Sequence, residues 1–186
     1  CGTAYYAGLV AKYWFERYAR LPVEIDVASE FRYREAPLPE NGLAVFISQS
    51  GETADTLASL RYCREQGQTI VSVVNVPQST IARESHAILA TLAGPEIGVA
   101  STKAFTCQLT VLGALAIAAG RMRGVLDART EAELVHALIE LPRLMNMVLR
   151  RETEFEKIAH ILSHASDVLY LGRGIHYPLA LEGALK

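Results

Sequence analysis

Short apolar runs alternate with helical patterns along most of the 186-residue chain. Each run is rich in apolar and β-branched residues and is bounded by turn residues, which is typical of a buried strand and too short for a helix. The run at 22–27 alternates with acidic residues instead, as expected for a strand near a sheet edge. Strands are expected at residues 22–27, 43–47, 69–74, 86–92 and 167–171.

Apolar residues at helical spacing predict helices between these strands. The expected helices cover residues 4–19, 53–66, 103–122, 130–147, 153–165 and a last one that reaches Lys186, with short helical turns at 28–33 and 77–85. Pro142 should bend or split the helix that contains it. The apolar positions of that helix and the next are typical of a core. Strands that alternate with helices predict an α/β fold, a doubly wound parallel sheet with its ligand at the carboxyl ends of the strands.

The stretch around the second expected strand is the richest in chemistry. Ser48-Gln49-Ser50-Gly51-Glu52-Thr53 follows the strand and opens a helix. The first N–H groups of a helix lack internal partners and its dipole favours negative charge, so hydroxyl groups placed there form an anion site. We interpret this turn as a phosphate site. The alternative is that Ser50 or Thr53 merely caps the helix while Glu52 or Asp55 complements its dipole.

A second loop of small residues precedes the long helix at 103–122. Gly98, Ala100, Ser101 and Thr102 permit close approach of the backbone to a ligand. Lys103 is the only base of this loop, and we expect it in the site or in an internal ion pair. Two such loops at one edge of a sheet predict a pocket for a small anionic metabolite.

Composition narrows the class of partner. The formal net charge of −2 offers no electrostatic footprint for nucleic acid or an anionic membrane. Three cysteines without paired or metal-type spacing suit a reducing compartment, so a cytoplasmic location is expected. The histidines form no metal-ligand motif, and we expect no metal and no cofactor.

Both ends of the sequence predict a fragment. Cys1-Gly2-Thr3 has the character of a turn that leaves a strand, so the first strand of the sheet would precede it. A strand, a small-residue turn and a tyrosine-bearing helix recur from residue 167, which indicates the start of a second copy of the same unit. The expected organisation is a first subdomain at 1–124, a helical linker at 125–166 and the start of a second subdomain at 167–186.

These motifs together resemble a known family. Ser48–Thr53 is similar to the phosphate loop of sugar isomerase (SIS) domains, which have a flavodoxin-like fold. Its combination with Ala28–Tyr33, Glu96–Thr106 and Leu181–Lys186 resembles the isomerase half of the glutamine–fructose-6-phosphate aminotransferases, or glucosamine-6-phosphate synthases. The resemblance covers essentially the whole chain.

The resemblance implies a substrate and a set of site residues. In the family, a glutaminase domain releases ammonia from glutamine, and two SIS subdomains add it to fructose-6-phosphate and isomerise the imine to glucosamine-6-phosphate. Ser48, Gln49, Ser50 and Thr53 would hold the phosphate, and the sugar would be lined by Cys1, Gly2, Thr3, Val99, Ala100 and Ser101. Ala4 stands where the family usually has a serine, which implies weaker phosphate binding or a compensating water.

Glu182 and Lys186 match residues of the family's proton-transfer machinery. Moving a proton between C1 and C2 needs a carboxylate base and a cation for the developing enolate. As an i,i+4 pair they could equally form a plain surface salt bridge. The family's principal glutamate base, its ring-opening histidine, its C-terminal lysine and its glutaminase domain do not occur in this sequence, so we expect hexose-6-phosphate binding without complete catalysis.

The same resemblance implies a homodimer. Two other functions fit a SIS domain: a phosphosugar sensor that regulates a partner domain, and an enzyme that removes sugars from amine adducts.

Overall fold

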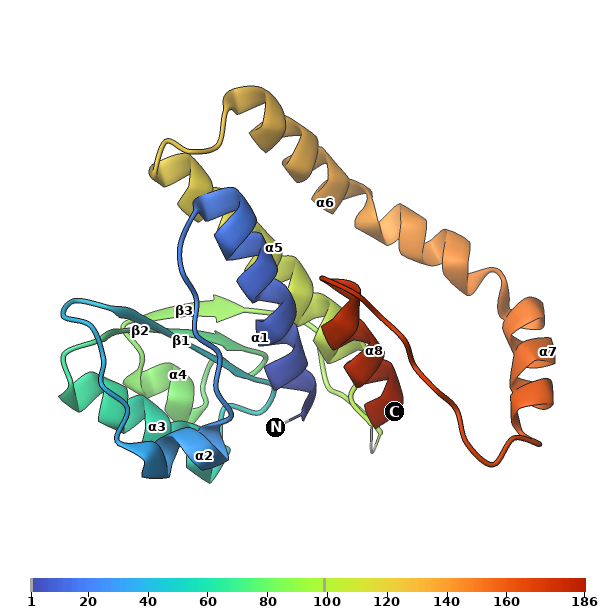
Figure 1. Ribbon diagram of the computed structural model, residues 1–186, viewed down its shortest axis with the longest axis horizontal. Coiled ribbons are helices and arrows are strands. Elements are labelled where there is room, and N and C mark those ends of the chain that lie inside the picture. The colour runs from blue at the N-terminus through green and yellow to red at the C-terminus, as the bar shows by residue number, and fades with distance from the viewer. Residues whose placement is uncertain (1, 99) are drawn as a thin grey trace.

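A parallel sheet forms the centre of the protein. The computed structural model describes residues 2–98 and 100–186. Its strands are β1 (Leu43–Ser48), β2 (Thr69–Val74) and β3 (Ala87–Ala90), in the order β1-β2-β3 (Figure 1). The register pairs Leu43 with Thr69 and Val71 with Ala87. Because the strands are parallel, their carboxyl ends share one edge of the sheet.

Helices cover both faces of this sheet, as expected for a doubly wound α/β fold. One face carries α1 (Gly2–Trp14), the π-helical turn η1 (Phe15–Ala19) that continues it, and α5 (Lys103–Met122). The other face carries α2 (Ala28–Arg34), α3 (Ala54–Glu65) and α4 (Thr80–Glu84). The expected helices and strands in this part of the chain are confirmed except at 22–27, and β3 is shorter than expected.

Alternation along the strands gives each face its own core. Val73 packs with α1 and α5, in a cluster that includes Phe105 and Leu112. Its neighbour Val74 faces the other way and packs with Leu60 of α3 and other residues. The period of two along β2 therefore directs adjacent valines into opposite layers.

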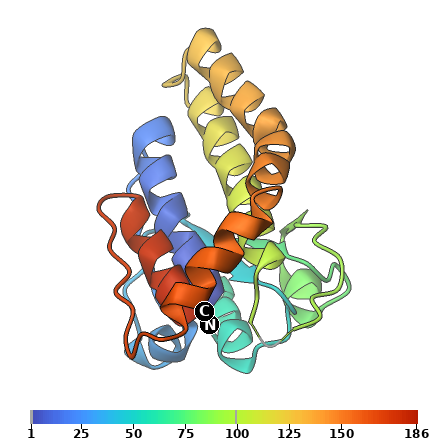
Figure 2. The ribbon, with the colours of Figure 1, turned by 90° about the vertical axis from the view of Figure 1, so that its right-hand side faces the viewer.

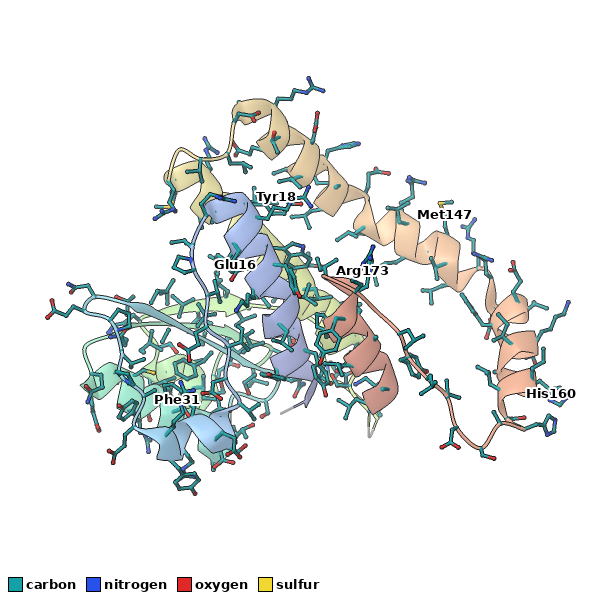
Figure 3. The ribbon with its side chains drawn as sticks, in the orientation of Figure 1. Glu16, Tyr18, Phe31, Met147, His160 and Arg173 are labelled. Atoms are coloured by element: carbon teal, nitrogen blue, oxygen red, sulfur yellow. The ribbon has the colours of Figure 1, made fainter. Side chains whose placement is uncertain are left out.

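The last third of the chain leaves this body and returns to it. α6 (Ala128–Leu149) and α7 (Glu152–Leu162) form a long arm, and an extended segment leads back to α8 (His176–Leu185), which packs beside α1 (Figures 1 and 2). Side chains of the arm such as Met147 and His160 lie away from the sheet and its covering helices (Figure 3).

The core-like assignment of the arm is wrong. Residues 128–162 are all described, and no residue of α6 or α7 is buried. Ile139 is 68% exposed and Leu149 is 69% exposed. An amphipathic pattern specifies an apolar face but not the surface that covers it, and this chain does not cover it. Pro142 does not split α6, which continues through it as one helix.

Two expected strands are also wrong. Residues 22–27 and 167–171 belong to no strand of the described structure. A strand exists only when a neighbour supplies its ladder hydrogen bonds, and the sequence pattern reports side-chain burial rather than pairing. At 167–171 the burial itself fails as well, since Leu169 is 85% exposed and Leu171 is 88% exposed.

By length and composition, α5 is the one helix in the described residues that could cross a membrane. It packs instead against α1, η1 and β2, and residues such as Leu112 and Ala116 are buried there. This is the environment of a core helix.

A pair of truncations distinguishes the core from the arm. Leu112→Ala empties a site that is 1% exposed and should cost about 2–5 kcal/mol of unfolding free energy, whereas Ile139→Ala on α6 should cost less than ~1 kcal/mol. Urea denaturation followed by circular dichroism measures both. Equal losses at the two positions would mean that the arm is as buried as the core in solution.

Candidate functional site

A cavity of about 560 Å³ lies where the carboxyl end of β1 meets the first turns of α1 and α3. Hydroxyl, amide and apolar groups line it, and Lys186 is the only charged side chain among the described lining residues. The lining residues are Gly2, Thr3, Ala4, Ile47, Ser48, Gln49, Ser50, Thr53, Thr56, Ala100, Ser101, Gln108, Leu185 and Lys186.

Hydroxyl donors surround the start of α3. Ser48 ends β1, and its Oγ accepts the N–H of Gly51 at 3.0 Å. The Oγ of Ser50 accepts the N–H of Glu52 at 3.3 Å. In both bonds the hydroxyl oxygen is the acceptor, so its own hydrogen is left to donate. The serine loop, residues 48–53, therefore offers O–H donors next to the free N–H groups of a helix.

Side-chain capping is wrong for this loop, although Asp55, one of the two acidic residues expected to complement the helix dipole, does lie in the first turn of α3. Thr53 occupies the N-cap position of α3, yet its side chain makes no capping hydrogen bond to the described residues. Glu52 turns to the N–H of Thr80 at 2.7 Å, a bond that holds the pKa of its carboxyl below the ordinary value. Asp55 lies in the first turn of α3, but its Oδ1 binds Arg32 at 2.7 Å. The positive end of α3 thus faces the cavity without a side-chain cap.

Gly51 holds the serine loop in place through its backbone. Its φ of +67° favours glycine, and a Cβ added there would lie 2.0 Å from the Oγ of Ser79. Ser79 is 1% exposed and caps α4 by accepting the N–H of Ala82. The carbonyl of Gly51 also accepts the N–H of Ile81 at 3.0 Å. The loop is therefore packed directly against the start of α4.

The second loop caps the N-terminus of α5 with one of its own side chains, that of Glu96. The carboxylate of Glu96 accepts the N–H of Thr102 at 3.0 Å, the hydroxyl of Ser101 at 3.0 Å and the N–H of Ala104 at 3.3 Å. The Thr102 N–H, together with the Ser101 hydroxyl, holds the pKa of Glu96 below its ordinary value. A carboxylate thus already binds N–H groups at this helix end, whereas no side chain of the described residues caps the start of α3.

Lys103 does not take either of its expected roles. It is exposed, it is not among the residues that line the cavity, and it forms no ion pair with the described residues.

Residues from the two ends of the chain meet beside the cavity. Lys186, the C-cap residue of α8, lies 2.8 Å from Oε1 of Glu182 and donates to Oγ1 of Thr3 at 3.0 Å. The Thr3 hydroxyl in turn donates to Oε1 of Glu182 at 3.1 Å. The expected i,i+4 salt bridge therefore forms, but it is mostly buried rather than on the surface, since the Glu182 side chain is only 7% exposed and that of Lys186 26%. Oε2 of Glu182 is buried and accepts no hydrogen bond from the described residues.

Most of the predicted site residues meet in this one cavity. Those that line it are Gly2, Thr3, Ser48, Gln49, Ser50, Thr53, Ala100, Ser101 and Lys186. Glu182 is not a lining residue and reaches the cavity through Thr3 and Lys186. Cys1 and Val99 lie outside the described residues.

Sequence reasoning missed Thr56 and Gln108, together with the apolar lining residues Ile47 and Leu185. Thr56 is 8% exposed and Gln108 is 2% exposed. A signal for Gln108 existed, because it is a polar residue on the buried face of α5 that also contains Phe105 and Leu112.

A second hollow of about 440 Å³ lies near the end of α1 and η1. Its lining includes Trp14, Tyr18 and Arg17. It lacks the hydroxyl loop and the uncapped helix end, so we place the candidate site at the first cavity. Among the described residues, no group of three or more His, Cys, Asp or Glu is arranged to hold a metal ion.

A pair of glycine substitutions tests how the serine loop is held. Gly67 also has a positive φ, +75°, but nothing lies within 4 Å of its added Cβ. Gly67→Ala should therefore cost only the backbone strain, about 1–2 kcal/mol, whereas Gly51→Ala should cost more because Ser79 must move. Chemical denaturation of the two variants gives the comparison. A Gly51 variant as stable as the Gly67 variant would contradict the packing described.

Comparison with known proteins agrees with this fold. The family model described as "SIS domain" matches residues 1–118. The chain is 69% identical over 186 residues to a glutamine–fructose-6-phosphate aminotransferase (isomerizing) of Bradyrhizobium diazoefficiens and 67% identical to one of Brucella abortus. In both cases the whole chain is covered but only 31% of the relative.

A solved structure agrees with the same assignment. The C-terminal domain of glucosamine-fructose-6-phosphate aminotransferase from Francisella tularensis superposes with a TM-score of 0.97 at 44% identity, and the match covers all of this chain and 52% of that one. The family match spans more than half of this chain and includes both loops of the cavity. The chain therefore belongs to the SIS domain family.

Proposed function

We propose that the cavity binds a hexose-6-phosphate and that the chain is the sugar-phosphate-binding isomerase part of a glutamine–fructose-6-phosphate aminotransferase. The observation that carries the proposal is the uncapped N-terminus of α3 surrounded by the hydroxyls of the serine loop. Free N–H groups, O–H donors and one nearby ammonium form an environment for a phosphate dianion.

The serine loop would hold the phosphate. Ser48, Gln49, Ser50 and Thr53 all border the cavity at its α3 end. Their donors would act together with the first N–H groups of α3, which no side chain of the described residues caps. Glu96 makes the end of α5 a poor alternative, because its carboxylate would repel a phosphate there.

The sugar would extend from the phosphate toward α1 and the second loop. Gly2, Thr3, Ala100 and Ser101 border this part of the cavity. Cys1 and Val99 stay in the proposed lining on the strength of the sequence resemblance alone. The Ser101 hydroxyl donates to Glu96, so toward a sugar hydroxyl it would serve as an acceptor.

Glu182 and Lys186 would belong to the proton-transfer machinery. Isomerisation moves a proton between C1 and C2 of the sugar, which builds negative charge on the neighbouring oxygen. Lys186 borders the cavity and can neutralise that charge, while Glu182 fixes the ammonium through its 2.8 Å ion pair. Oε2 of Glu182 is buried without a hydrogen-bond partner among the described residues, so the carboxylate would act on the cavity through Lys186 and Thr3.

The parent protein would combine this chemistry with glutamine. We propose that it converts fructose-6-phosphate and glutamine to glucosamine-6-phosphate and glutamate, as the names of its relatives suggest, and that a glutaminase domain supplies the ammonia. Within this chain, residues 1–124 would form a first SIS subdomain, 125–166 a helical linker and 167–186 the start of a second. A cytoplasmic homodimer is part of the same proposal, and the exposed apolar residues of α6 and α7 are compatible with it.

Removing two hydroxyls from the serine loop tests the phosphate assignment. The double variant Ser50→Ala/Thr53→Ala should lose ~1–3 kcal/mol of binding free energy for each charge-assisted hydrogen bond to fructose-6-phosphate. Isothermal titration calorimetry measures the loss. The control pair, Thr153→Ala/Ser163→Ala, removes the same groups from the exposed arm. Unchanged affinity in the first double variant would refute the phosphate assignment.

Restoring a hydroxyl at position 4 should have the opposite effect. Ala4 lines the cavity and carries a methyl group where the sequence resemblance implies a serine. Ala4→Ser should therefore strengthen binding of fructose-6-phosphate by about 1 kcal/mol, the usual net value of a hydrogen bond. The same calorimetric titration measures this gain. Ala7→Ser is not a suitable control, because Ala7 is fully buried. A weaker complex would place the phosphate away from the first turn of α1.

A further inference from the structure

Gln108 is a buried amide whose oxygen has no hydrogen-bond partner among the described residues. It lies on α5 between Phe105 and Leu112, and it is only 2% exposed. Its Oε1 is buried and accepts no hydrogen bond from the described residues. The same side chain lines the cavity. An unpaired polar group in the buried face of a core helix lowers stability, and leucine or methionine would fill the space without that cost.

The chemistry of the amide indicates which part of a ligand it would meet. A phosphate oxygen only accepts hydrogen bonds, so it could use the NH2 group of the amide but would leave Oε1 unpaired. A sugar hydroxyl both donates and accepts, and a glutamine amide complements it in either orientation. The O–H and N–H donors at the start of α3 suit the phosphate, whereas the amide of Gln108 supplies the acceptor that a polyol needs.

We propose that Gln108 is a specificity-determining residue, whose amide binds a hydroxyl of the sugar and so distinguishes a polyhydroxy phosphate from a simple phosphate. This inference rests on the proposed function, because it assumes that a sugar phosphate occupies the cavity. It adds a contact that none of the loop motifs contains. The hydroxyl satisfies the buried amide only in the complex, so binding recovers free energy that the unliganded fold gives up.

Gln108→Leu tests the proposal on the chain itself. Calorimetry should show fructose-6-phosphate binding weakened ~5- to 30-fold, since one buried hydrogen bond is lost. Affinity for inorganic phosphate, the second probe, should stay within about twofold. Gln78→Leu, at an exposed position, is the matched control and should change neither affinity. Gln108→Met removes the amide with an unbranched side chain and replaces the leucine variant if that variant folds poorly.

Thermal melting without ligand separates recognition from a structural role. Leucine removes an unsatisfied buried acceptor, so the melting temperature of Gln108→Leu should equal or exceed that of the wild type. A lower melting temperature together with equal losses for both probes would overturn the proposal in favour of a structural glutamine. Unchanged fructose-6-phosphate affinity would overturn it as well, because water would then satisfy the amide. If the wild type binds inorganic phosphate but no hexose-6-phosphate, the proposed function fails and this inference fails with it.

Discussion

The site depends on an asymmetry between two helix ends. Both α3 and α5 begin at loops that border the cavity, and both helix dipoles favour an anion there. At α5 the carboxylate of Glu96 already satisfies the first N–H groups. At α3 no side chain of the described residues does so, and Gly51 keeps the serine loop packed against Ser79 while its hydroxyls face the cavity. The start of α3 is thus left without a side-chain cap, whereas the start of α5 is capped by Glu96.

The second requirement is that the two ends of the chain meet. Thr3, in the first turn of α1, is hydrogen-bonded to both Glu182 and Lys186 at the other end of the chain. Thr3 and Glu182 are 179 positions apart in the sequence. This contact holds Lys186, the one cation among the described lining residues, at the cavity. Glu182 is mostly buried, so its ion pair with Lys186 is better insulated from solvent than a surface pair.

Sequence patterns correctly predicted the helices and strands whose bounds depend on local sequence. The strand at 69–74 and the helix at 103–122 were bounded correctly, because each has a strong period and clear turn residues at its ends. The strand predictions at 22–27 and 167–171 were wrong because a strand needs a partner strand to pair with. The prediction that α6 and α7 belong to a core was wrong because no described part of this chain covers their apolar face. Within the site, the loop residues followed from their motifs. Gln108 did not, since it belongs to no loop motif and only the packed structure reveals that its Oε1 has no partner among the described residues.

A crystal structure of the chain with fructose-6-phosphate is the most direct test of this account. The account predicts phosphate oxygens within hydrogen-bond distance of Ser50, of Thr53 and of the first N–H groups of α3, with Glu96 still bound to the start of α5. A phosphate at the N-terminus of α5 with Glu96 displaced, or a ligand outside the cavity, would contradict it.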